Sequence, residues 1–171
     1  SKEMLNIASK RVPGVKLYQQ DMARLNVDDT FDVITCVFDS INHLLGFNNW
    51  KNFFLLSYNH LSNRGIFIFD MNTISKLEKL SEAKPTTKSI KNKILSIKVE
   101  KDSDSIFNWN IKILDKNDKI CICKENIKET SFELEKIEVC LKHIFKEVVK
   151  TDQNGNKATS NSSRVFFVCL K

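Results

Sequence analysis

The chain has 171 residues and a formal net charge of +6, with 42% hydrophobic and 28% charged residues. These totals are typical of one globular domain with a real core, and the low glycine and proline content argues against a disordered chain. No stretch of about 18 apolar residues occurs, which excludes a membrane-spanning helix. No apolar segment near Ser1 predicts a signal peptide.

The positive charge comes from lysine far more than from arginine, which occurs only at positions 11, 24, 64 and 164. Arginine is the better residue for bidentate contacts with phosphate and guanine. In the lysine-rich segment 84–101, Lys alternates with apolar residues, so we interpret it as the solvated face of a strand. We therefore expect no nucleic-acid partner.

The five cysteines are odd in number and lie mostly at apolar positions of predicted strands and helices. This usage is typical of a reducing compartment, so we predict a cytoplasmic protein. Cys121 and Cys123 share one face of a predicted strand, but no second pair or suitably spaced histidine completes a tetrahedral site. We expect no bound metal.

Strands and helices alternate in the first half of the chain. The predicted elements are a helix over 4–8, a strand over 15–20, a strand over 33–38, a helix over 50–61 capped by Asn48 or Asn49, a turn over 61–65 and a strand over 66–69. Such alternation predicts a parallel sheet with right-handed crossovers.

The pattern changes after Leu80, where a polar connector over 81–87 is followed by three alternating runs. These runs predict an antiparallel meander with one apolar face, followed by a helix over 132–144 and a hairpin of strands 147–152 and 164–170. The predicted class is α/β: a partial Rossmann-like sheet, mostly parallel with a C-terminal antiparallel hairpin, plus a three-stranded antiparallel insertion over 88–130.

Two predicted strands end abruptly in polar residues. The apolar run 33–38 is followed by Asp39-Ser-Ile-Asn-His43, and the strand 66–69 by Asp70-Met-Asn-Thr73. Ligands of open α/β sheets bind just beyond the carboxyl ends of such strands. The two polar tips therefore predict one shared cleft.

In this order, the segments resemble the later two-thirds of a class I S-adenosylmethionine-dependent methyltransferase. The similarity is closest to the small-molecule branch that includes glycine N-methyltransferase-like enzymes, and it covers residues 1–75 and, more loosely, the last helix and hairpin. The segments that carry it are Ser1–Leu5, Gln20–Met22, Phe31–Leu44 and Leu61–Thr73.

This resemblance implies one methyltransferase-like domain over 1–171, incomplete at its N-terminus, in which the insertion 88–130 covers the acceptor site. The glycine-rich turn that cradles the cofactor in the family has no counterpart, since no G-x-G cluster occurs. We therefore expect a gap in the sheet and poor cofactor binding by the sequence as it stands. We also expect this sequence to be a fragment of a chain longer by one or two βα units.

The resemblance also implies roles for particular residues. The residues that would contact S-adenosylmethionine are Asp21, Met22, Phe38 and Asp39. Those that would contact the small-molecule acceptor are Asn42, Asp70, Asn72 and Trp109. His43 could act as general base. Structural roles remain open: a turn for Asp21, a cap for Asp39 and core packing for Trp109.

We therefore expect an enzyme that transfers a methyl group from S-adenosylmethionine to nitrogen or oxygen of a small molecule, either alone or as a homodimer. One alternative is a non-catalytic, methyltransferase-like interaction module that has lost its cofactor turn. An RNA methyltransferase is a third, and it predicts RNA binding that weakens steeply with salt.

Overall fold

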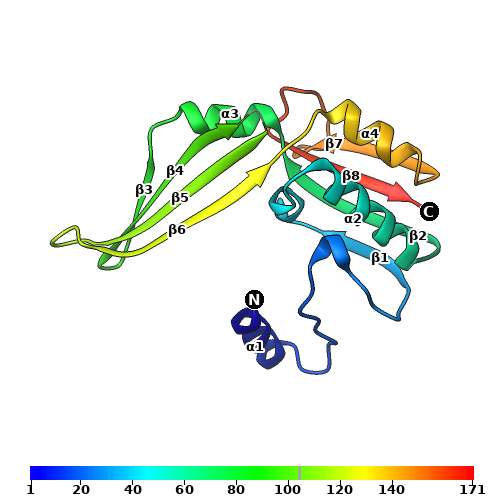
Figure 1. Cartoon of the computed structure of the whole chain (residues 1–171), viewed down its shortest axis with the longest axis horizontal. Helices are drawn as coiled ribbons and strands as arrows, with labels where there is room; N and C mark the ends of the chain where they lie inside the picture. The colour runs from blue at the N-terminus through cyan, green and yellow to red at the C-terminus, as the bar shows by residue number, and fades with distance from the viewer. Residues whose placement is uncertain (104) are drawn as a thin grey trace.

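The computed structural model describes residues 1–103 and 105–171 and contains two four-stranded sheets. The first sheet, sheet A, has the order β1 (Phe31–Cys36), β2 (Leu61–Asn72), β8 (Arg164–Leu170) and β7 (Glu147–Asp152). The second, sheet B, has the order β3 (Thr86–Ile90), β4 (Lys93–Ser103), β5 (Ile106–Asp115) and β6 (Cys121–Thr130). Sheet B extends away from sheet A as an arm (Figure 1).

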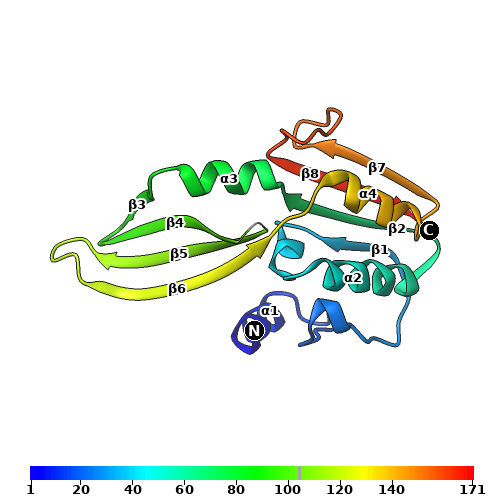
Figure 2. The same cartoon turned by 45° about the horizontal axis from the view of Figure 1, so that its top comes forward.

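Sheet A is mixed. Strand β1 runs parallel to β2, whereas β2 and β8, and β8 and β7, pair antiparallel. The helices α2 (Phe47–His60) and α4 (Leu134–Lys142) lie along one face of this sheet (Figure 2). Their apolar side chains form the main core with the β2 and β8 residues that face them. The rings of Phe69 and Phe167 stack across the two strands, with centroids 4.8 Å apart.

Sheet B is antiparallel throughout and is covered by α3 (Ile74–Glu82). A second, small core lies between them, formed by the buried residues Leu77, Val99 and Phe107. The predicted meander is confirmed, with one strand more than the sequence indicated. All five residues of β3 are exposed, so this strand carries no apolar alternation.

The segment 15–20 is not a strand, contrary to the prediction. Its residues are exposed and form no backbone strand pairing with any described segment. A run of alternating residues forms a stable strand only beside a partner strand. Strand β1 is consequently an edge of sheet A. The helix α1 (Lys2–Arg11) buries none of its residues and stands apart from both sheets (Figure 1).

Two local predictions were also wrong. Helix α2 begins at Phe47 after Gly46, which takes a φ of 86° that favours glycine, and neither Asn48 nor Asn49 is its cap. The predicted turn over 61–65 belongs to β2, where a Cβ at Gly65 would lie 2.9 Å from the Ser62 carbonyl oxygen. The α/β class is confirmed. Among the described residues, no helix is long and apolar enough to cross a membrane.

Candidate functional site at the strand ends

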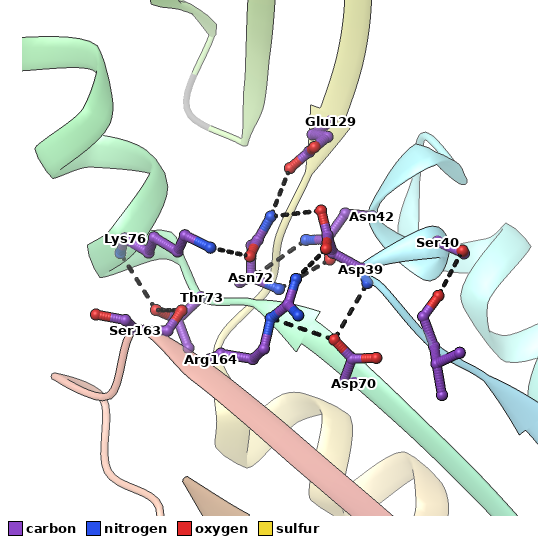
Figure 3. Close-up of polar contacts among 11 residues, drawn as sticks. Asp39, Ser40, Asn42, Asp70, Asn72, Thr73, Lys76, Glu129, Ser163 and Arg164 are labelled. Carbon is purple, nitrogen blue, oxygen red and sulfur yellow. Dashed lines mark hydrogen bonds and ion pairs between the residues drawn. The ribbon is translucent and has the colours of Figure 1, made fainter. Parts of the chain in front are cut away.

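The carboxyl end of β1 continues into a strained turn. Phe38 and Asp39 have φ values of 59° and 51°, a left-handed conformation that residues with a Cβ rarely adopt. The short helix η2 (Ser40–His43) follows at once. This turn aims the Asp39 backbone N–H at the end of β2, where it donates to Asp70 Oδ2 over 3.1 Å (Figure 3).

Asn42 connects this turn to both sheets through hydrogen bonds. Its Oδ1 accepts the Asn72 backbone N–H at 3.0 Å, and its Nδ2 donates to the carbonyl oxygens of Asn72 and Thr130 at 3.0 and 2.8 Å. The side chain is fully buried. Since these three bonds occupy both polar ends of the amide, Asn42 positions the end of β2 against the end of β6.

Asn72 is the centre of a polar network (Figure 3). Its Nδ2 donates to Asp39 Oδ2 at 2.9 Å and to Glu129 Oε2 at 3.0 Å, while its Oδ1 accepts Lys76 Nζ at 2.7 Å. A lysine can only donate and ionised carboxylates can only accept, so these partners fix the orientation of the amide. One side chain thus connects sheet A, sheet B and α3.

Arg164, the first residue of β8, binds two carboxylates. Its Nη2 donates to Asp39 Oδ1, and its Nε lies 3.3 Å from Oδ2 of the buried Asp70. Asp70 Oδ1 is buried and has no hydrogen-bond partner among the described residues. A buried polar atom in this state costs about 1–3 kcal/mol. In proteins it is commonly explained by a bound ion, water or ligand.

The cluster is negative on balance. It holds the carboxylates of Asp39, Asp70 and Glu129 against the cations of Lys76 and Arg164. Burial raises the pKa of Glu129 and lowers that of Lys76, with the charge of Arg164 adding to the effect on Lys76. In both groups burial therefore favours the neutral form.

His43 and Phe38 lie at the rim of this cluster. His43 is exposed on η2, with Nδ1 3.3 Å from the carbonyl oxygen of Lys128. The Phe38 side chain is 78% exposed although its backbone is strained. The structure therefore brings both beside the cluster and leaves the Phe38 ring free to contact a ligand.

Three predicted site residues lie outside the network. Asp21 caps the short helix η1 (Met22–Arg24), accepting the Ala23 N–H at 2.9 Å, and Met22 Sδ lies 3.9 Å from Cys36 Sγ. Because Cys36 ends β1, Met22 still flanks the strand end. Trp109 packs against the small core of sheet B and lines a cavity of about 200 Å³ beside Leu80.

Sequence reasoning missed three members of the network: Lys76, Glu129 and Arg164. Arg164 offered a signal, as one of four arginines and the first residue of an apolar strand. Glu129 and Lys76 offered none, because charged residues are common near the ends of strands and helices.

Comparison with known proteins shows what the arrangement is similar to. No protein-family model and no curated protein sequence matches the chain. Among solved structures, a S-adenosylmethionine-dependent methyltransferase from Clostridium acetobutylicum aligns with a TM-score of 0.84 and 26% identity, over 99% of this chain and 72% of that one. The chain has a partial methyltransferase fold.

Two further structures support this fold at lower identity. An amino pentose methyltransferase from Micromonospora echinaspora gives a TM-score of 0.74 at 16% identity, over 99% of this chain and 70% of that one. A sugar N-methyltransferase from Streptoalloteichus gives a TM-score of 0.74 at 14% identity, over 100% of this chain and 68% of that one. The predicted methyltransferase-like fold is confirmed, while the glycine N-methyltransferase-like branch stays a prediction.

Proposed function

We propose that the protein transfers a methyl group from S-adenosylmethionine to a nitrogen or oxygen atom of a small molecule. One observation carries the proposal: the polar tips of β1 and β2 form a single network in a methyltransferase fold, at the edge where open α/β sheets bind ligands. S-adenosylmethionine would supply a methyl group on a sulfonium, whose C–S bond breaks as the acceptor's lone pair forms the new bond.

The residues at the strand ends fit such a cation. The cluster has three carboxylates and two cations, and the exposed Phe38 ring offers a face that attracts positive charge. We assign cofactor contacts to Phe38 and Asp39, with Asp21 and Met22 flanking the end of β1. The strain at Phe38 and Asp39 supports this assignment, since strained backbone clusters at functional sites.

For the acceptor we propose a nitrogen atom before an oxygen atom. Two of the solved structures with this fold are described as an amino pentose methyltransferase and a sugar N-methyltransferase. Asp70 and Asn72 would orient the acceptor through the network, and His43 at the rim is a candidate general base. Trp109 is more distant in the fold, so an acceptor that reaches it must extend along sheet B.

Calorimetry of the 171-residue chain with S-adenosylhomocysteine tests the proposal. We expect weak saturable binding, and an Asp39→Asn variant should bind less well. The matched control is Asp115→Asn, a change at the far end of β5. No heat of binding at millimolar ligand would contradict the proposal.

The second candidate function is a non-catalytic interaction module. Strand β1 is an edge of sheet A, and its residues Phe31 and Val33 are 39% and 55% exposed. Exposed apolar groups on a strand edge favour pairing with another chain, including a second copy. This candidate predicts no S-adenosylhomocysteine binding, and sedimentation of the chain tests for a homodimer.

The remaining expectations are proposals of the same kind. We propose a small-molecule partner, no nucleic-acid partner and a cytoplasmic location. RNA binding that falls steeply as salt rises would overturn the second of these, since each neutralised phosphate adds to the slope.

A further inference from the structure

Glu129 is the carboxylate of the strand-end cluster that has no cation bound to it. Arg164 pairs with Asp39 and Asp70, and Lys76 Nζ donates to the Asn72 oxygen. Glu129 receives only the neutral amide of Asn72, at 3.0 Å, although the side chain is 4% exposed. Across the described residues no ion pair involves Glu129. A buried charge in this position is costly unless a cation joins it.

A second, independent feature points the same way. Asp70 is 1% exposed, and its Oδ1 has no donor among the described residues while its Oδ2 has two. Figure 3 shows this oxygen turned away from Arg164, toward the end of β1. Two carboxylates of one cluster thus have acceptor capacity left for a further donor, and the cluster lies beside the ends of β1 and β2, where ligands of open α/β sheets bind.

The other charged groups around Glu129 leave the balance negative. Asp39 adds a negative charge through the shared Asn72 amide, and Lys76 and Arg164 are engaged with other atoms. On the sheet B side, Lys128 Nζ lies 3.4 Å from Asp102 Oδ2, and His43 faces the Lys128 carbonyl. A neutral hydroxyl would leave Glu129 uncompensated, whereas an ammonium ion would neutralise it.

We infer that the methyl acceptor is an amine that enters as an ammonium ion, and that the Glu129 carboxylate binds this ammonium and takes its proton. The inference rests on the proposed function. In the proton step an N–H bond of the ammonium breaks, its electron pair stays on nitrogen as the lone pair, and the proton binds a Glu129 oxygen. The neutral amine is then the nucleophile, and the glutamic acid returns its proton to water.

The environment of Glu129 suits a proton acceptor. Burial raises the pKa of Glu129 and the charge of Asp39 adds to this, while the Asn72 hydrogen bond and the charges of His43 and Lys76 lower it. A carboxylate whose pKa is raised is a stronger proton acceptor than an ordinary glutamate. A bound ammonium should lower that pKa again, because an adjacent positive charge favours the carboxylate.

Two matched ligand pairs test the inference on the full chain, with and without saturating S-adenosylhomocysteine: glucosamine and glucose, and butylammonium and 1-butanol. Each pair differs by an ammonium in place of a hydroxyl group. Carboxyl-13C NMR of labelled glutamate, with the Glu129 signal assigned by its loss in Glu129→Gln, reports both binding and the pKa. We expect the ammonium ligands alone to shift the Glu129 signal and to lower its pKa.

The variant Glu129→Gln keeps the hydrogen bond to Asn72 and removes the charge. It should weaken binding of the ammonium ligands by about 10- to 100-fold, the usual effect of losing a charge-assisted hydrogen bond. Glu125→Gln, an exposed position on the same strand, should bind like wild type.

The outcomes separate the inference from the proposed function. Equal effects of the ammonium and hydroxyl ligands on Glu129, while S-adenosylhomocysteine binds, overturn the inference alone. Absence of S-adenosylhomocysteine binding, while the ammonium preference persists, overturns the proposed function and leaves Glu129 as a cation site. Because the NMR experiment uses the wild-type chain, it remains decisive even if Glu129→Gln does not fold.

Discussion

The strained turn after β1 shows how single residues shape the site. Phe38 and Asp39 hold a left-handed backbone, and in return the Asp39 N–H reaches Asp70 and the Phe38 ring faces solvent. A residue with a Cβ pays about 1–2 kcal/mol for this conformation. The contacts of Asn42, Asn72 and Arg164 hold the turn in place.

Two substitutions of Phe38 distinguish the cost of its backbone strain from the contribution of its ring to packing. Phe38→Gly should be more stable than Phe38→Ala by about 1 kcal/mol, because only glycine adopts a φ near 59° without strain. Both variants lose the same exposed ring, so alanine is the matched control. Urea denaturation measures the two free energies of unfolding. Equal stability would show that the turn is not strained in solution.

Asn42 gives the opposite expectation, a large loss of stability. Asn42→Ala removes three buried hydrogen bonds and takes this partner from the Asn72 N–H and the Thr130 carbonyl, while the Asn72 carbonyl keeps the Ser131 hydroxyl, so we expect a loss of about 2–4 kcal/mol in the free energy of unfolding. Asn48→Ala, at an exposed position of α2, should change it by less than about 0.5 kcal/mol. Similar values for the two variants in urea would contradict the assigned role.

The raised pKa of Glu129 predicts how the stability of the chain depends on pH. Its folded-state value is raised, mainly by burial, so the folded chain binds more protons than the unfolded chain between the ordinary carboxyl value and the raised one. Stability from this group is therefore full at low pH and falls as pH rises through that window. Glu129→Gln lacks this fall, so its stability relative to wild type should increase from pH 4 upward. Urea titrations at successive pH values, with Glu125→Gln as control, measure the difference.

At the scale of elements, the sequence predicted most of those that bury an apolar face, although it missed α3, which buries Leu77. The hairpin of β7 and β8 occupies the predicted residues, and β1, α2 and α4 lie within a few residues of theirs. Elements without such a face were missed, as β3 was, or predicted where no partner strand exists, as at 15–20. Alternation records which side of a strand is buried but not whether a neighbour is available.

Local sequence patterns predicted some of the site residues and not others. Asp39 and Asp70 were predicted to converge because both follow parallel strands, and they do. Glu129 comes from sheet B and Lys76 from α3, and their approach to Asn72 depends on how the sheets join. Local patterns contain no information on that junction, so these residues could not be predicted.

The docking of α3 on sheet B depends on a very small core. Leu77 is fully buried between α3 and the sheet, with Val99 and Phe107 as the other buried members. We expect Leu77→Ala to cost about 2–4 kcal/mol, because a cavity forms where few neighbours can collapse into it. Leu55→Ala on α2, at a side chain 47% exposed, should cost less than about 1 kcal/mol. Thermal denaturation followed by circular dichroism compares the two, and equal losses would contradict the prediction.

At the scale of the whole molecule, the two cores are very unequal. The main core of sheet A, α2 and α4 contains 18 buried residues, and that of sheet B and α3 contains three. Hydrophobic stabilisation grows with the apolar area removed from water, so sheet B should open more readily than sheet A. The two sheets meet at the network of Asn42, Asn72 and Glu129, which fixes the base of the arm.

Hydrogen exchange measures this difference directly. Amides in the distal half of β4, β5 and β6 should exchange faster than those of β2 and β8, because the distal strands have no large core beneath them. Leu77→Ala should speed exchange throughout sheet B and leave the centre of sheet A unchanged. Asn42→Ala, in contrast, should speed exchange first at Asn72 and Thr130, where the sheets join. Uniform protection across both sheets would show that they open as one unit, with the junction network strong enough to make up for the small core.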